Sequence, residues 1–229
     1  MTGRLRILGI ALGLIGLAFI VAGGFAFLKV QEGQTSLKAF SAAQAVELSY
    51  NEDGQLVDRG ETAGADAIMA LLTEEWGYPV LGWELDPNDP VVNTGSEYMY
   101  QMATVAYHTL HGAQTIVLEE DFTAPDGTVY TAGTPYEIPV DGRYWAQFDR
   151  ESPIDAAVRE QAWTGVAHAL IAELGVGAST AAALQLGLGL AALFGMIGGT
   201  LILTGAGLVW ATRAEKEPVP VLTPAGVPA

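Results

Sequence analysis

The sequence has 229 residues, enough for one domain of ordinary size together with two membrane-spanning segments. Residues 30–180 hold 24 of the 26 acids and five of the ten bases, so this middle segment carries a formal charge of -19. A surface of that sign repels nucleic acid, which argues against such a partner. The absence of cysteine excludes disulfides, thiolate-bound zinc, iron-sulfur clusters and a cysteine nucleophile.

The chain opens with six residues that include Arg4 and Arg6, followed by an apolar run over residues 7–28. At about 1.5 Å of rise per residue, this run is long enough to cross the roughly 30 Å hydrocarbon layer. A cleaved signal peptide shares the basic start, but its apolar region is usually about 7 to 15 residues long. We therefore expect an uncleaved anchor, preceded by a cytoplasmic segment at residues 1–6.

The segment from residue 29 to residue 180 is predicted to be an acidic α+β domain. A helix is expected over residues 65–76, and a turn with two prolines over residues 86–90. The clearest helix follows, over residues 98–110, because Thr94 and Glu97 have the spacing of a capping box.

Short β-rich segments alternate with turn residues in the second half of this domain, which predicts a small antiparallel sheet. Ser152, Pro153 and Asp155 then form a second helix start, for a helix that runs to about residue 174. Gly175 and Gly177 mark a break or hinge, unless the helix continues through them. The expected strands are residues 115–118, 128–131, 136–140 and 144–148.

A second uncharged run covers residues 181–211 and ends at Arg213 and Lys216. Bases at the outer ends of both runs predict that both termini are cytoplasmic and that the middle domain is extracytoplasmic. Residues 212–229 contain four prolines and little apolar bulk, so we expect a disordered cytoplasmic tail. The fold class is thus a membrane α+β protein with two transmembrane helices flanking an outer domain.

Gly9 and Gly13 are four residues apart in the first span, as are Gly195 and Gly199 in the second. Small residues at this spacing allow helix backbones to approach closely in lipid. They predict packing of the two spans on each other, or a docking face for another membrane protein. Glycine is also common in membrane helices without such a role.

His108 and His111 lie three residues apart on one predicted helix, so both imidazoles could face a metal ion. A zinc site would need a third ligand, and a metalloprotease would need a different spacing. Two partly buried histidines near a helix C-terminus are the alternative, and no cofactor is predicted. The acidic pairs of the domain do not form a recognisable catalytic site, and phosphate-binding or nucleophile-elbow motifs are absent.

Aromatic residues are concentrated between residues 76 and 107. They could form a ligand cleft or a partner surface, since aromatic side chains dominate binding hot spots. The alternative is an ordinary core, or contact with the membrane interface. These residues are Trp76, Tyr78, Trp83, Tyr98, Tyr100 and Tyr107.

The run from Asp86 to Thr94, the segments 97–102 and 107–112, and the glycine-rich second span resemble a group of uncharacterised two-span envelope proteins of high-GC Gram-positive bacteria. The resemblance covers most of the chain. Some similar sequences are labelled aromatic ring-opening dioxygenases, but the His and Glu ligand set of such iron enzymes has no match here. The resemblance therefore implies no functional residue.

Three functions remain open at this point. The first is a non-enzymatic accessory or scaffold subunit of a cell-envelope membrane complex, with the lipid bilayer and other membrane proteins, or a second copy, as partners. The second is an extracytoplasmic module that senses or binds a ligand in an aromatic pocket. The third is a metal-dependent enzyme that uses His108 and His111.

Overall fold

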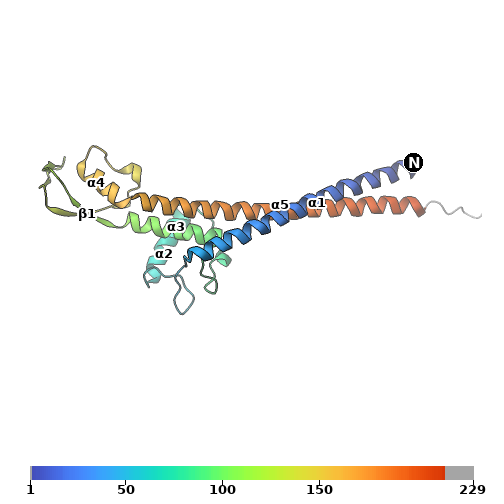
Figure 1. Ribbon diagram of the computed structural model, residues 1–229, viewed down its shortest axis with the longest axis horizontal. Helices are drawn as coiled ribbons and strands as arrows, with labels where there is room; N and C mark the ends of the chain where they lie inside the picture. The colour runs from blue at the N-terminus through green and yellow to red at the C-terminus, as the bar shows by residue number, and fades with distance from the viewer. Residues whose placement is uncertain (1, 215–229) are drawn as a thin grey trace, which may run out of the picture. The chain divides into compact units, whose positions relative to one another are not determined.

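The computed structural model of the protein describes residues 2–214 (Figure 1). The described residues divide into two units: a hairpin unit formed by residues 2–33 and 184–214, and a middle unit formed by residues 34–183. Two long helices, α1 (Thr2–Gln44) and α5 (Gly165–Ala214), each contribute to both units. The expected tail lies outside the described residues from residue 215 onward, as does Lys216.

In the hairpin unit, α1 and α5 run antiparallel and approach each other at glycines. Gly16 faces Gly198 so closely that a Cβ on Gly16 would lie 2.7 Å from the carbonyl oxygen of Gly198. Gly9 faces Gly205 in the same way. The buried small residues recur every seven positions, at residues 9, 16 and 23 on α1 and at residues 191, 198 and 205 on α5. This is the period of a coiled coil, and the small side chains allow the two backbones to approach closely.

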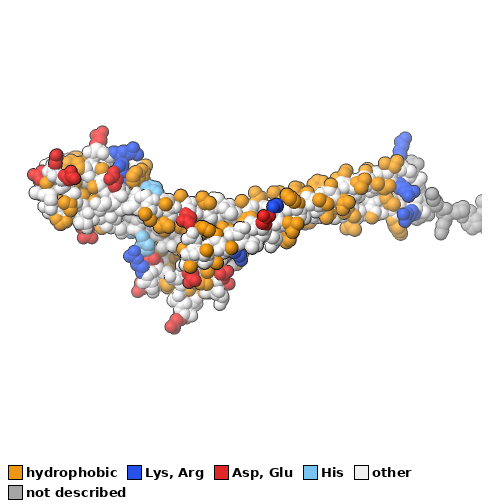
Figure 2. Space-filling model, viewed as in Figure 1, with side chains coloured by type: hydrophobic (Ala, Val, Ile, Leu, Met, Phe, Trp, Pro, Cys, Tyr) orange, Lys and Arg blue, Asp and Glu red, His pale blue; other side chains and the backbone are white. Residues whose placement is uncertain are grey.

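The outward faces of the hairpin unit are apolar and exposed. Only 11% of the most apolar 18-residue stretch of each helix is buried inside the protein, whereas the core helix of a soluble domain would be mostly buried. Ile7 is 70% exposed and Leu203 is 75% exposed. Figure 2 shows this surface as a band of hydrophobic side chains along the two helices. By length and composition, both helices are able to cross a membrane.

The middle unit begins within the last part of α1, at residue 34. Ala45 adopts a left-handed conformation with φ of 51°, and its N–H donates to the carbonyl of Ser41, which closes the last turn of the helix. Helix α2 (Thr62–Ala70) continues directly into a π-helical turn, η1 (Leu71–Glu75). A short 3-10 helix, η2 (Gly82–Glu84), follows before the next long element.

Helix α3 (Gly95–Leu110) has the predicted capping box. The Thr94 side chain accepts from the backbone N–H of Glu97, and the Glu97 carboxylate accepts from the N–H of Thr94 at 2.8 Å. This prediction is confirmed. The helix buries one face against both apolar cores of the unit, described below.

The β-structure is antiparallel, as predicted, but it forms two separate two-stranded sheets instead of one. A hairpin turn at Gly127, where φ is 88°, joins two very short strands that pair with each other. The two longer strands form a separate sheet. Residues 144–148 were expected as a strand and instead contain a 3-10 helix, η3 (Trp145–Gln147). The Gln147 side chain accepts from the backbone N–H of Tyr144 at 2.7 Å, and the ring of Tyr144 stacks on Trp163. The pairs are β1 (Ala113–Val117) with β4 (Pro135–Pro139), and β2 (Phe122–Thr123) with β3 (Val129–Tyr130).

Helix α4 (Pro153–Ala162) begins at the predicted Ser152 cap, whose hydroxyl accepts from the N–H of Asp155. It ends well before residue 174, however. The break lies at Trp163 and Thr164, where the Thr164 hydroxyl accepts from the N–H of Ala167 and starts α5. Helix α5 then continues through Gly175 and Gly177, which was the alternative to a break or hinge there.

Two clusters of buried apolar residues form the core of the middle unit. One joins α4 and the β1–β4 sheet to α3, and it centres on Ile116, Val140 and Val158. The other joins α2 and α3 to the unit's parts of α1 and α5, and it centres on Ile68 and Leu72. A pocket lies where α1, α3 and α5 meet in this unit.

Candidate functional site

An apolar pocket of about 400 Å³ lies between α1, α3 and α5 in the middle unit. Its volume and lining are those of small-molecule sites, which are mostly apolar and carry a few polar groups. Each helix supplies side chains from one face, and the three stretches are far apart in the sequence. The main apolar lining residues are Leu37, Phe40, Val46, Val92, Val105, Leu170, Leu174 and Val176.

Tyr98 joins the three helices at this pocket. Its hydroxyl lies 2.7 Å from the hydroxyl of Ser41 on α1, and both side chains are buried. Its ring lies against α5 at Gly177, where a Cβ would come within 2.5 Å of a ring carbon. Gly177 therefore provides the space in which the ring sits, and the hydroxyl pair adds polar character to a mainly apolar lining.

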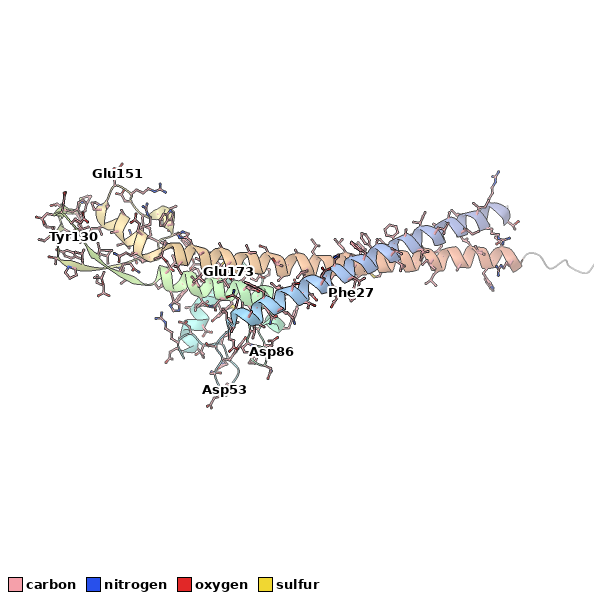
Figure 3. All side chains as sticks on the ribbon, viewed as in Figure 1. Phe27, Asp53, Asp86, Tyr130, Glu151 and Glu173 are labelled. Atoms are coloured by element: carbon pink, nitrogen blue, oxygen red, sulfur yellow. The ribbon has the colours of Figure 1, made fainter. Side chains whose placement is uncertain are left out.

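The remaining polar lining groups are amides, one hydroxyl and one carboxylate. They are Gln44, Gln101, Thr180 and Glu173, and Figure 3 labels Glu173 on α5. None of the described residues that line the pocket is Lys, Arg or His. The pocket therefore offers a bound molecule apolar contacts and hydrogen bonds, without a counter-charge for an anion.

A second polar cluster lies at the start of α3. The Glu84 carboxylate is buried and accepts from the backbone N–H of Ser96 at 2.8 Å, and the Ser96 hydroxyl accepts from the N–H of Leu81 at 3.0 Å. Burial and the nearby Glu84 charge raise the pKa of the Tyr78 hydroxyl. The carboxylate binds a helix N-terminus, where negative charge is favourable, so this cluster orders the loop before α3.

Glu97 is also almost fully buried. Its carboxylate accepts from the backbone N–H groups of Asn93 and Thr94, at 2.9 and 2.8 Å. Burial is the largest influence on this group and raises its pKa, in spite of these hydrogen bonds. Glu97 thus completes the capping box at the cost of holding a carboxylate away from water.

His108 pairs with Asp58, which the sequence did not single out. The His108 Nε2 atom lies 2.9 Å from a carboxylate oxygen of Asp58. Burial raises the pKa of the nearby Tyr100, and it raises that of Tyr50 to about 12. Both phenols therefore stay protonated at neutral pH. Asp58 is fifty residues from His108, so no local pattern could have predicted the pair.

His111 lies apart from this pair. Its Nδ1 atom is 3.0 Å from the carbonyl oxygen of Tyr107, and its ring stacks on the Tyr107 ring at a centroid distance of 4.2 Å. Within residues 2–214, no group of three or more His, Cys, Asp or Glu side chains is arranged to hold a metal ion. The two histidines thus have different partners, and the third ligand that zinc requires is not among the described side chains.

Five of the six aromatic residues between 76 and 107 belong to or pack against one apolar core, the one centred on Ile68 and Leu72. Trp76 donates from its indole nitrogen to the Tyr144 hydroxyl at 2.9 Å and packs against both apolar cores. Tyr98 and Tyr100 are buried, and Tyr78 and Tyr107 are half-buried. Trp83 is 74% exposed. Only Tyr98 of this set lines the pocket.

The predicted glycine positions in the hairpin unit have different surroundings. Gly9 lies in the close contact, and the backbone of Gly13 is next to Gly205. The backbone nitrogen of Gly195 would lie 3.3 Å from a Cβ on Gly23, so Gly195 also borders the contact, whereas a Cβ on Gly199 would meet nothing within 4 Å. Gly16, Gly23 and Gly198 are not part of the predicted four-residue pairs, but Gly9, Gly16 and Gly23, like Gly198 and Gly205, are seven residues apart, a spacing that the sequence shows.

No known protein family matches the chain, and neither a curated protein nor a solved structure shows significant similarity to it. Function must therefore be inferred from the site.

Proposed function

We propose that this chain is an integral membrane protein whose middle unit binds a small hydrophobic molecule in the pocket between α1, α3 and α5. The observation that carries the proposal is the pocket itself: about 400 Å³, walled by eight apolar side chains, with a buried hydroxyl pair in its lining. Apolar pockets with a few convergent polar groups are the usual form of small-molecule sites.

Two exposed apolar helices support placement in a membrane, because their outward faces would otherwise contact water. The bases at Arg4, Arg6 and Arg213 favour cytoplasmic termini, and the middle unit would then lie outside the cytoplasm. In that arrangement, the pocket is open to molecules on the outer side of the membrane.

Binding is favoured over catalysis by the composition of the pocket lining. Its one ionisable group other than the Tyr98 phenol is the exposed carboxylate of Glu173, which has no positioned nucleophile or acid-base partner among the described lining residues. The Asp58–His108 pair involves none of the residues that line the pocket. A binding role requires only the volume and the apolar walls.

The proposal is tested by purifying the full chain from membranes in gentle detergent and identifying the small molecules that accompany it by mass spectrometry. Val105→Phe adds bulk inside the pocket, and Val117→Phe makes the same change at an exposed position of β1. We expect a co-purifying molecule with the wild type and with Val117→Phe, and its loss with Val105→Phe. Equal occupancy in all three proteins would contradict the proposal.

A role as an accessory or scaffold subunit is the second candidate, and Trp83 favours it. This residue is 74% exposed on η2, beside Leu81, which is 39% exposed. Exposed tryptophan is typical of the centre of protein interfaces. The same purification tests this function: a stoichiometric membrane protein that is lost with Trp83→Ala but retained with Val105→Phe would make the accessory role the primary one.

A further inference from the structure

We infer that the pocket selects an uncharged aliphatic molecule, such as the single chain of a neutral lipid, and rejects anionic amphiphiles of the same length. This inference rests on the proposed function and adds the chemical class of the ligand. It follows from the charges around the pocket and from the chemistry of its hydroxyl pair.

Among the described side chains that line the pocket, the ionic charge is negative only. Glu173 is the single ionic group in the described lining, and the segment that contains the pocket carries -19. A carboxylate, phosphate or sulfonate bound here would lose hydration and gain no cation in return. It would also be repelled by Glu173 at short range. An uncharged molecule meets neither penalty.

The Ser41–Tyr98 pair suits a neutral polar group. Each hydroxyl can donate one hydrogen bond and accept two. The bond between the two oxygens, at 2.7 Å, uses one hydrogen, so the pair keeps a second hydrogen and several acceptor positions. A ligand hydroxyl can use both kinds of position at once, and the apolar walls can hold its aliphatic chain.

The walls also favour an aliphatic chain over a flat aromatic molecule. Seven of the eight apolar lining residues are Leu or Val, and the eighth is Phe40. Six of the eight lie on the facing stretches of α1, α3 and α5. Phe40 and Tyr98 are the aromatic members, and the ring of Tyr98 is already in contact with Gly177. Branched aliphatic walls provide contacts without the stacking face that an aromatic ligand would use.

The test uses the full chain in phosphatidylcholine nanodiscs and a diazirine-bearing 1-dodecanol as the probe. After illumination, labelled residues are mapped by mass spectrometry, with unlabelled 1-dodecanol or dodecyl sulfonate as competitor at concentrations far below that of the lipid. We expect labels within residues 37–46 and 170–180. At least about a tenfold higher concentration of the sulfonate should be needed for equal competition, because a desolvated anion without a partner is strongly disfavoured.

Charge reversal supplies the matched control. Glu173→Lys should bring dodecyl sulfonate to within about threefold of dodecanol, since it replaces repulsion by attraction at the pocket. Glu137→Lys makes the same change on β4, outside the lining, and should leave the tenfold difference in place.

The outcomes separate the two proposals. If the sulfonate competes as well as the alcohol in the wild type, selection by charge is refuted, while labelling of the pocket still supports binding there. If Glu173→Lys and Glu137→Lys behave alike, the charge of Glu173 does not set the selectivity, and the inference is overturned. If no label maps to the pocket, both the inference and the proposed function fail.

Discussion

The position of the Tyr98 ring depends on glycine at residue 177, which has no side chain. Its ring occupies the position where a Cβ of residue 177 would be, and its hydroxyl pairs with Ser41. Gly177 lies inside a long helix, where glycine costs about 0.5–1 kcal/mol relative to alanine. The close ring contact is the physical reason for this glycine.

Gly177→Ala should therefore destabilise the middle unit, by about 1–3 kcal/mol, because the ring of Tyr98 must move and its hydrogen bond weakens. Gly175→Ala is the control, since a Cβ there would make an ordinary contact of 3.9 Å with Met102. That variant should be neutral or slightly stabilising, from its better helix propensity. Thermal unfolding of both variants in detergent measures the difference. Equal midpoints would contradict this account of Gly177.

Glu97 gives a dependence on pH whose sign follows from its burial. Its pKa in the folded protein is raised above the ordinary value of 4.5, so the folded state binds this proton more tightly than the unfolded state does. The contribution of the group to the free energy of unfolding is thus largest below pH 4.5 and is lost as the pH rises through the folded-state pKa. Other carboxylates titrate in the same range, and a variant is needed to isolate this one.

Glu97→Gln keeps an oxygen that can accept from Asn93 and Thr94 but removes the titration. We expect the stability of this variant relative to the wild type to increase between about pH 4 and pH 7. Glu97→Ala should be less stable than Glu97→Gln by about 1–2 kcal/mol at every pH, because the capping box is broken and backbone N–H groups lose their acceptor. Unfolding midpoints across this pH range provide the measurement. A difference between the Glu97→Gln variant and the wild type that does not change with pH would show that the burial of Glu97 has no net effect on its proton affinity.

At the scale of elements, the hairpin unit is built on a seven-residue repeat of small residues. Gly9, Gly16 and Gly23 on α1 meet Gly205, Gly198 and Ala191 on α5. Every one of these positions is buried, while large apolar side chains occupy the outward faces. The glycines that pack the helices are thus occupied within the chain itself, and are not free to contact another membrane protein.

Gly205→Val and Gly207→Val test this arrangement with the same substitution, two residues apart on one helix. A side chain at residue 205 would collide with the backbone of Gly9, whereas a side chain at residue 207 would meet nothing within 4 Å. We expect a loss of about 1–3 kcal/mol for Gly205→Val and little change for Gly207→Val. The unfolding midpoint in detergent reports both, and similar effects of the two changes would rule out the close contact.

Element boundaries were predictable where a local signal sets them. The capping box at Thr94 and the cap at Ser152 act over three residues, and both were found from the sequence. The end of α4 at Trp163 was not, because it depends on contacts made across the fold: the Trp163 indole donates to the carbonyl of Arg143 at 3.1 Å. For the same reason, residues 144–148 could not be separated from a strand by composition alone.

At the scale of the whole molecule, the proposal predicts an orientation in the membrane, with both termini cytoplasmic and the middle unit outside. The chain has no cysteine, so a single introduced thiol reports its own position without background. We expect a membrane-impermeant maleimide added to intact cells to label Asp126→Cys, in the exposed turn between β2 and β3, but not Ala214→Cys. Labelling of Ala214→Cys alone would invert the proposed orientation.

The sequence by itself determined the two apolar spans that lie within the long helices, the acidic middle segment, the antiparallel character of the short strands and the two capped helix starts. These features depend on composition and on residues within one or two turns of each other. Tertiary structure alone decided the pocket, the Asp58–His108 pair and the role of Gly177. Each of these joins positions from about fifty to well over one hundred residues apart, so their proximity depends on how the helices pack, and no short-range pattern records it.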